Sequence, residues 1–149
     1  MASTADANGP ELSLVVPMYN EEESCTLFFE RVIAILEGIS PRFEIVCVND
    51  GSTDRTLDIL VSHHARDHRI KIVDLSRNFG KELALTAGLD NASGQAVIPI
   101  DADLQDPPEL IVDLVAKWRQ GFDMVVAVRR DRSTGRLAGG VVSENDRLT

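Results

Sequence analysis

Short apolar runs alternate with segments of helical periodicity along this chain, and that alternation restricts the possible folds more than any other feature. The runs are β-branched and of strand length: Leu12–Val16, Phe43–Val48, Ile70–Leu75, Ala96–Ile100 and Met124–Val128. Strands that are apolar at nearly every position are typical of a parallel sheet, because both of its faces are covered by helices.

The intervals between the runs carry apolar residues at the three- and four-residue spacing of one helix face. These stripes are Leu27, Phe28, Val32, Ile35 and Leu36; Leu57, Leu60 and Val61; Leu83, Ala84, Ala87 and Gly88; and Leu110, Ile111, Leu114, Val115 and Trp118. We expect Ser52 or Thr53 to cap the second helix, and Pro107 and Pro108 to form the first turn of the fourth. The β-α-β-α-β-α-β-α-β order predicts a doubly wound, mostly parallel α/β sheet with helices on both faces.

The chain of 149 residues is long enough for one domain with a sizeable core. We expect this domain over residues 11–132. Residues 1–10 lack the basic start and apolar stretch of a signal peptide, so we interpret them as a disordered leader. Residues 133–149 begin as a polar stretch and contain Gly139 and Gly140, and we expect a flexible tail there.

Charge and cysteine content narrow the possible partners and compartment. A net charge of −9 argues against nucleic acid as a partner, because phosphate backbones require a basic surface. Phosphate ligands remain possible, since a metal ion or a local arginine pair can override the overall sign. Cys25 and Cys47 lie in apolar stretches and are expected to be buried, reduced thiols, which favours the cytoplasm. No apolar run in the sequence approaches the roughly 18–20 residues that cross a bilayer.

Polar side chains are concentrated directly after the predicted strands. The five segments are Pro17–Glu22, Asn49–Asp54, Ser76–Lys81, Asp101–Asp106 and Arg129–Arg130. The loops at the other ends of the strands, such as residues 37–41 and 91–94, resemble plain turns. Ligands of open α/β sheets bind beyond the carboxyl ends of the strands, so this asymmetry predicts a functional site at that edge.

The segment after the fourth run carries the strongest chemical signal. Asp101, Asp103 and Gln105 alternate, and in an extended segment alternate residues project to the same side. Two carboxylates and an amide oxygen converging on one point suit a hard cation such as Mg²⁺ or Mn²⁺. The alternative is that these acids cap the following helix, an explanation that fits Asp106 with Pro107 better than Asp101 and Asp103.

The other segments give weaker signals. The turn after the second run is explained by Gly51 and by capping, but these leave Asp50 unexplained; an acid at a strand end can accept hydrogen bonds from a base or a ribose. Arg77 and Lys81 could neutralise phosphate or pair with nearby acids. Of Arg129 and Arg130, at least one could face a phosphate, while solvated surface charge is the alternative for the other.

Other classes of site fit the sequence poorly. His64 and His68 have the i, i+4 spacing of a metal pair, but they lie far from the strand ends, so a solvated helix face is the favoured interpretation. Ser24 and Ser52 have no plausible histidine partner for nucleophilic catalysis. A phospho-receiver domain would need an aspartate after the third strand, and no Gly-x-Gly-x-x-Gly of a dinucleotide-binding oxidoreductase follows the first.

Four motifs, in order along the chain, resemble those of family 2 glycosyltransferases of the GT-A fold. They are Val15–Glu22 (VVPMYNEE), Val48–Asp54 (VNDGSTD), Arg77–Glu82 (RNFGKE) and Asp101–Pro108 (DADLQDPP). The polyprenyl-phosphate branch, which includes dolichyl-phosphate mannosyltransferases and undecaprenyl-phosphate sugar transferases, is the most similar. The resemblance covers about residues 11–132 and implies a Rossmann-like nucleotide-binding half.

The resemblance implies roles for individual residues. It places Pro17, Tyr19, Glu21 and Asp50 around the nucleoside of a nucleotide-sugar, with Lys81 and Ala102 beside the donor. It makes Asp101, Asp103 and Gln105 the ligands of a Mg²⁺ or Mn²⁺ ion that bridges the donor diphosphate. Asp103 and Arg129 are its candidates for catalysis, Arg129 through contact with phosphate near the reacting centre.

The implied activity is metal-dependent, inverting transfer of a sugar from a UDP- or GDP-type donor to a polyprenyl phosphate. Relatives in this branch continue well past the fifth strand with acceptor-binding elements and often membrane helices. Association with the cytoplasmic face of a membrane would therefore depend on parts absent from this chain. The alternative is a truncated module that binds a nucleotide-sugar without transferring it.

Overall fold

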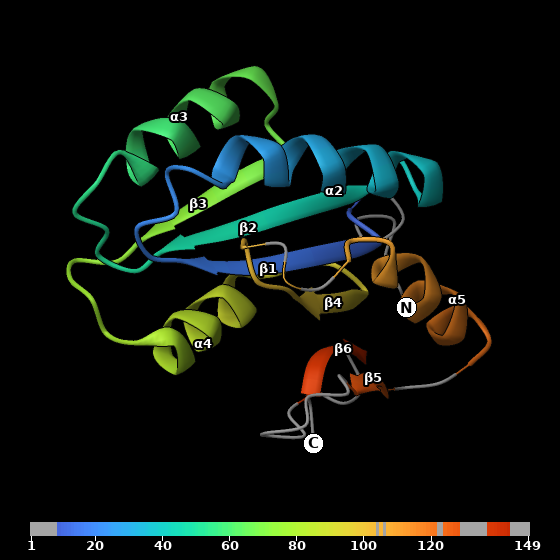
Figure 1. Ribbon diagram of the computed structural model, residues 1–149. Helices are drawn as coiled ribbons and strands as arrows, with labels where there is room; N and C mark the ends of the chain where they lie inside the picture. Colours follow the sequence, from blue (N-terminus) through green and yellow to red (C-terminus); the bar gives the residue numbers. More distant parts are fainter. Residues whose placement is uncertain (1–8, 104, 106, 122–123, 129–136, 144–149) are drawn as a thin grey trace.

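The computed structural model describes residues 9–103, 105, 107–121, 124–128 and 137–143, which form six strands and four helices (Figure 1). The strands are β1 (Leu12–Met18), β2 (Phe43–Asn49), β3 (Ile70–Asp74), β4 (Ala96–Pro99), β5 (Met124–Val128) and β6 (Leu137–Ser143). The helices are α2 (Cys25–Ile39), α3 (Thr56–Arg66), α4 (Lys81–Asn91) and α5 (Leu110–Arg119). None of the described helices combines the length and apolarity that a bilayer span requires.

A parallel half-sheet forms the centre of the fold. β1 lies between β2 and β4, and β3 pairs with the outer side of β2, all in parallel. Val15 is opposite Val46 on one side and Pro99 on the other. All residues of β2, and all but Pro17 in β1, are buried, as expected of strands covered on both faces. The predicted doubly wound, mostly parallel α/β class is confirmed.

Helices cover both faces of this sheet, and the alternation of side chains along each strand sorts the core into two layers. One layer joins Leu14, Ile45 and Ile98 to the buried faces of α2, α3 and α5. The other joins Val15, Val46 and Val97 to α4, which lies on the opposite face from α2 and α3 (Figure 1). Gly88 lets α4 approach closely, because a Cβ there would overlap the side chain of Val15.

The far side of the sheet differs from the predicted pattern. β5 occupies the predicted range but pairs antiparallel with β6, and β6 is inserted between β4 and β5. β6 lies within residues 133–149, so the expectation of a tail is wrong for residues 137–143. Gly139 and Gly140 weaken the strand signal, since glycine packs no side chain and is depleted in strands. The rest of the predicted tail, and the predicted leader except residues 9 and 10, lie outside the described residues.

The expected helix caps are also corrected. α3 begins at Thr56 with Arg55 at the cap position, and Asp54 Oδ1 accepts hydrogen bonds from Thr56 N (2.9 Å) and Thr56 Oγ1 (2.6 Å). Neither Ser52 nor Thr53 caps this helix. Pro107 and Pro108 precede the first helical residue of α5, and their carbonyl oxygens accept the first hydrogen bonds of that helix.

A buried acid at the amino ends of the strands joins distant parts of the chain. Glu44 on β2 is 2% exposed, and its Oε2 accepts hydrogen bonds from Ser13 Oγ (2.5 Å), Ser93 N (2.6 Å) and Ser93 Oγ (3.0 Å). Lys71 Nζ lies 2.7 Å from Oε1 as an ion pair, at angles that fall short of a hydrogen bond. Burial raises the pKa of Glu44, but these donors outweigh it and hold the pKa below its usual value.

Replacing Glu44 with glutamine should destabilise the fold by about 1–3 kcal/mol, because the charge-assisted bonds from Ser13 and Ser93 are weakened inside the protein. Urea unfolding at neutral pH would measure this. Glu37→Gln is the matched control, since Glu37 is exposed and its pair with Arg69 spans 3.3 Å; its cost should stay below about 1 kcal/mol. Equal effects of the two substitutions would contradict the role given to Glu44.

The stabilisation from Glu44 should also depend on pH. A carboxyl whose folded pKa is depressed stabilises the protein above its unfolded pKa of roughly 4.3, and this contribution disappears as the pH falls through the folded pKa. The difference in unfolding free energy between the native chain and Glu44→Gln should therefore be largest near neutrality and shrink below about pH 4. Unfolding curves at several pH values would test this; a difference that grows on acidification would contradict it.

Candidate functional site

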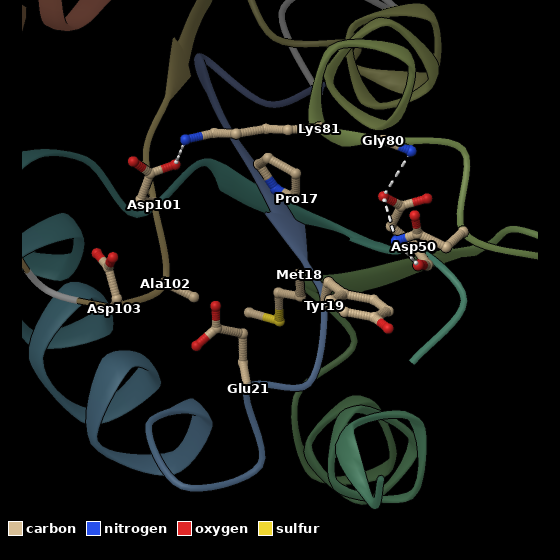
Figure 2. Close-up of a pocket in the computed structure, with 11 residues that line it drawn as sticks. Pro17, Met18, Tyr19, Glu21, Asp50, Gly80, Lys81, Asp101, Ala102 and Asp103 are labelled. Atoms are coloured by element: carbon tan, nitrogen blue, oxygen red, sulfur yellow. Dashed lines mark hydrogen bonds and ion pairs between the residues drawn. The ribbon is translucent and has the colours of Figure 1, made fainter. Parts of the chain in front are cut away.

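A cavity of about 380 Å³ opens at the carboxyl ends of β1, β2 and β4, at the edge where the sequence predicted a site (Figure 2). This volume is in the range of small-molecule pockets. The cavity is lined by Pro17, Met18, Tyr19, Glu21, Asp50, Asn78, Gly80, Lys81, Asp101, Ala102 and Asp103. Eight of these are residues that the sequence assigned to the site, so four loops far apart in sequence meet around one cavity.

Two predicted residues are not part of this lining. Gln105 is exposed, and its backbone N–H donates to Asp103 Oδ1 at 3.1 Å, so the described contact is made by its main chain. Arg129 lies outside the described residues. The ligand role of Gln105 and the phosphate role of Arg129 stay predictions.

The segment after β4 follows the alternation expected from its sequence. Ala102 is buried at 2% exposure, whereas Asp101 is half-buried and Asp103 is exposed. Asp101 Oδ1 pairs with Lys81 Nζ at 2.7 Å, across the cavity from the start of α4 (Figure 2). The carboxylates therefore stand at the cavity wall while Ala102 anchors the backbone between them.

Glu21 adds a third carboxylate to this region. Burial raises its pKa, and the negative charges of Asp103, Asp101 and Asp54 raise it further, against a hydrogen bond of 3.0 Å from Ser24 Oγ. A carboxyl whose pKa rises because of neighbouring acids marks a place where negative charge is poorly compensated. Such a place attracts a cation.

Asp50 organises the loop between β3 and α4. It is 3% exposed, and its carboxylate accepts hydrogen bonds from Phe79 N (2.8 Å), Gly80 N (3.1 Å) and Asn78 Nδ2 (3.2 Å). Gly51, with φ of 69°, lets the turn after β2 press against this loop, since a Cβ there would overlap the backbone of Asn78. Asp50 thus borders the cavity and at the same time fixes one of its walls.

Sequence reasoning missed Asn20, which joins the loops after β1 and β2. Its backbone lies in the left-handed region with φ of 52°. Its Oδ1 accepts from Thr53 N at 2.8 Å, and its N–H donates to Ser52 Oγ at 3.0 Å. Asparagine tolerates this conformation well, so its place directly after an apolar run was the available signal. Met18, Asn78 and Gly80 also line the cavity without having been singled out.

The residues present fit a hard divalent cation. The described residues contain no group of three or more His, Cys, Asp or Glu side chains arranged around one metal position. Asp101 and Asp103 nevertheless offer carboxylate oxygens at one wall, and Mg²⁺ is commonly held by one or two carboxylates with water and phosphate completing its shell. The Lys81 ammonium on Asp101 shows that this oxygen accepts a positive partner.

The histidines are explained by local contacts instead. His64 Nδ1 lies 2.6 Å from the carbonyl oxygen of Ile70, and the His64 and His68 rings meet edge to face. His63 packs against Phe29, with 4.6 Å between the ring centres. The two cysteines are buried and free, and burial raises the pKa of the Cys25 thiol to about 12.

Relatives of the chain share this segment and extend well beyond it. An uncharacterized glycosyltransferase of Synechocystis sp. is 59% identical over 122 residues, covering 82% of this chain and 38% of the relative. A prophage bactoprenol glucosyl transferase homolog of Escherichia coli is 52% identical, covering 85% and 42%. An undecaprenyl-phosphate 4-deoxy-4-formamido-L-arabinose transferase of Salmonella paratyphi A is 43% identical, covering 82% and 38%. The chain thus spans about two fifths of these relatives.

Solved structures and a family model agree with these relatives. The structure of Staphylococcus aureus TarS 1–349 with UDP-GlcNAc is 28% identical, with a TM-score of 0.64 over 85% of this chain and 36% of that one. A mannosyltransferase from Pyrobaculum calidifontis, solved with GDP-Man and Mn²⁺, is 24% identical with a TM-score of 0.70, covering 94% and 47%, and supports the fold alone. Residues 13–146 match the model of glycosyl transferase family 2. The chain therefore belongs to glycosyl transferase family 2.

Proposed function

We propose that this region binds a UDP- or GDP-type nucleotide-sugar together with Mg²⁺ or Mn²⁺. We further propose that the protein transfers the sugar, with inversion, to a polyprenyl phosphate. The observation that carries the proposal is the convergence of Asp101, Asp103 and Lys81 with Tyr19 and Asp50 around one cavity. That arrangement offers carboxylates for a metal, an ammonium for phosphate and an aromatic ring for a base.

The roles of the lining residues follow from their chemistry. Tyr19 is 46% exposed at the cavity and offers a face on which a base can stack. Pro17, Glu21 and Asp50 would complete the nucleoside pocket, and Ala102 would lie along the donor. Asp101 and Asp103, with Gln105 from the neighbouring turn, would hold the cation against the diphosphate.

Names and titles of relatives support the acceptor and the donor. The similar proteins of E. coli and Salmonella are described as acting on bactoprenol and undecaprenyl phosphate, and the TarS structure was solved with UDP-GlcNAc. A cytoplasmic location, at the membrane face where such lipids are loaded, is the corresponding proposal for the protein.

The chemistry asks little of this chain beyond positioning and charge. A bound divalent cation would stabilise the negative charge that develops on the departing nucleoside diphosphate. A phosphate oxygen of the acceptor attacks the anomeric carbon, and the bond from that carbon to the diphosphate breaks on the opposite face. Because a lipid phosphate is already anionic at neutral pH, the reaction needs no strong general base. Arg129 is proposed to contact phosphate near the reacting centre.

Calorimetry with UDP-glucose and GDP-mannose, each with and without Mn²⁺, tests the donor site directly. We expect binding of one of these donors to depend on Mn²⁺. Absence of binding to both nucleotides and to their free diphosphates, under all conditions, would refute the proposal. A module that binds but does not transfer would retain this binding, and an assay for lipid-linked product with the longer protein separates that alternative.

Replacing Asp103 with alanine should weaken Mn²⁺-dependent donor binding by at least roughly tenfold, because one of two carboxylate ligands is lost. The far-ultraviolet circular dichroism spectrum should not change, since Asp103 is exposed. Asp113→Ala on α5 is the matched control, an exposed acid that does not line the cavity. Unchanged affinity in Asp103→Ala would remove this residue from the site.

A further inference from the structure

Lys81 occupies a position that helix stability does not explain. It is the first residue of α4, where the helix macrodipole is positive and a cation is unfavourable. Its side chain nevertheless runs along the cavity, past Pro17, to Asp101 (Figure 2). The Nζ–Oδ1 distance is 2.7 Å, although the lysine side chain is 65% exposed and could extend into water.

The loop before Lys81 is held in place by buried contacts. Asp50 accepts the backbone N–H groups of Phe79 and Gly80, the two residues that precede Lys81. Asn78 Nδ2 also donates to the Asp50 carbonyl oxygen at 3.0 Å. The start of α4 is therefore fixed relative to β2, and the Lys81 side chain emerges at a constant distance from the end of β4. The ion pair follows from the fold and not from a chance surface encounter.

We propose that Lys81 is an internal counter-cation of the donor site, which neutralises Asp101 when the site is empty and gives way to the divalent cation when the donor binds. This inference rests on the proposed donor site. The released ammonium then lies beside the same cavity and pairs with the donor diphosphate. Lys81 is a positioning residue in the empty protein and a phosphate-binding residue in the loaded one.

The exchange makes metal and nucleotide binding cooperative. A cation arriving alone must displace an ammonium that then has no anionic partner in the cavity, so it binds weakly. A nucleotide diphosphate offers Lys81 a new anion, and this removes the penalty. By linkage, the nucleotide must increase metal affinity by the same factor as the metal increases nucleotide affinity.

Binding of Mn²⁺ alone, followed by the electron paramagnetic resonance signal of the free ion, tests the exchange. Lys81→Met should bind Mn²⁺ roughly three- to tenfold more tightly than the unsubstituted chain, because a competing charge is removed from Asp101. Lys117→Met, on the exposed face of α5, is the matched control and changes the net charge equally. Lys81→Arg keeps the positive charge and should resemble the unsubstituted chain.

The same titrations with UDP present provide the second readout. UDP should raise Mn²⁺ affinity strongly in the unsubstituted chain and several-fold less in Lys81→Met. The inference is overturned if Lys81→Met binds Mn²⁺ alone no more tightly than Lys117→Met does. Asp103→Ala distinguishes the two proposals: if Mn²⁺ binding is insensitive to that substitution as well, the donor site itself is misplaced, whereas sensitivity to it with an unaltered Lys81→Met refutes the exchange alone.

Discussion

Parallel pairing of β1 with both β2 and β4 is the constraint on which the rest of this structure depends. Parallel strands end at the same edge, so the loops after β1, β2 and β4 must meet whatever their sequences. The apolar runs stabilise the sheet by burying both faces, and this leaves the polar residues at the strand ends as the material for a site. The cavity at this edge is a consequence of topology, and its chemistry is a consequence of Asp50, Lys81, Asp101 and Asp103.

Direct contacts between loops turn that meeting point into a defined surface. Asn20 joins the loops after β1 and β2, while Asp50 joins those after β2 and β3. Neither contact crosses the sheet core, yet each fixes backbone that would otherwise be free to move relative to its neighbour. A site that must hold a cation and a diphosphate at fixed separation benefits from this order, because a preformed site loses less conformational entropy on binding.

The sequence predicted the sheet class, the central strands and the edge that carries the site, because burial on two faces and the placement of acids are written locally. It did not predict β6, because pairing of Leu137–Ser143 between β4 and β5 depends on distant partners and not on local propensity. It misplaced the α3 cap for the same reason: Ser52 and Thr53 are occupied by Asn20, a tertiary contact, and Asp54 takes over at the helix start. The contact of Asp50 with the loop before α4 was equally invisible, since residues 50 and 79 are joined only through the fold.

The two ends of the sheet treat buried or crowded acids in opposite ways. At the amino ends, Glu44 receives two hydroxyls, a backbone N–H and an ammonium, so its charge is compensated and its pKa falls. At the carboxyl ends, Glu21, Asp101 and Asp103 lie near one another with Lys81 as a nearby cation, and the pKa of Glu21 rises. A compensated acid stabilises the fold, whereas an uncompensated group stores an unfavourable interaction that an incoming cation relieves. The negative net charge of the chain is therefore no obstacle to binding a phosphorylated donor, because the acids at this edge act through the cation that they attract.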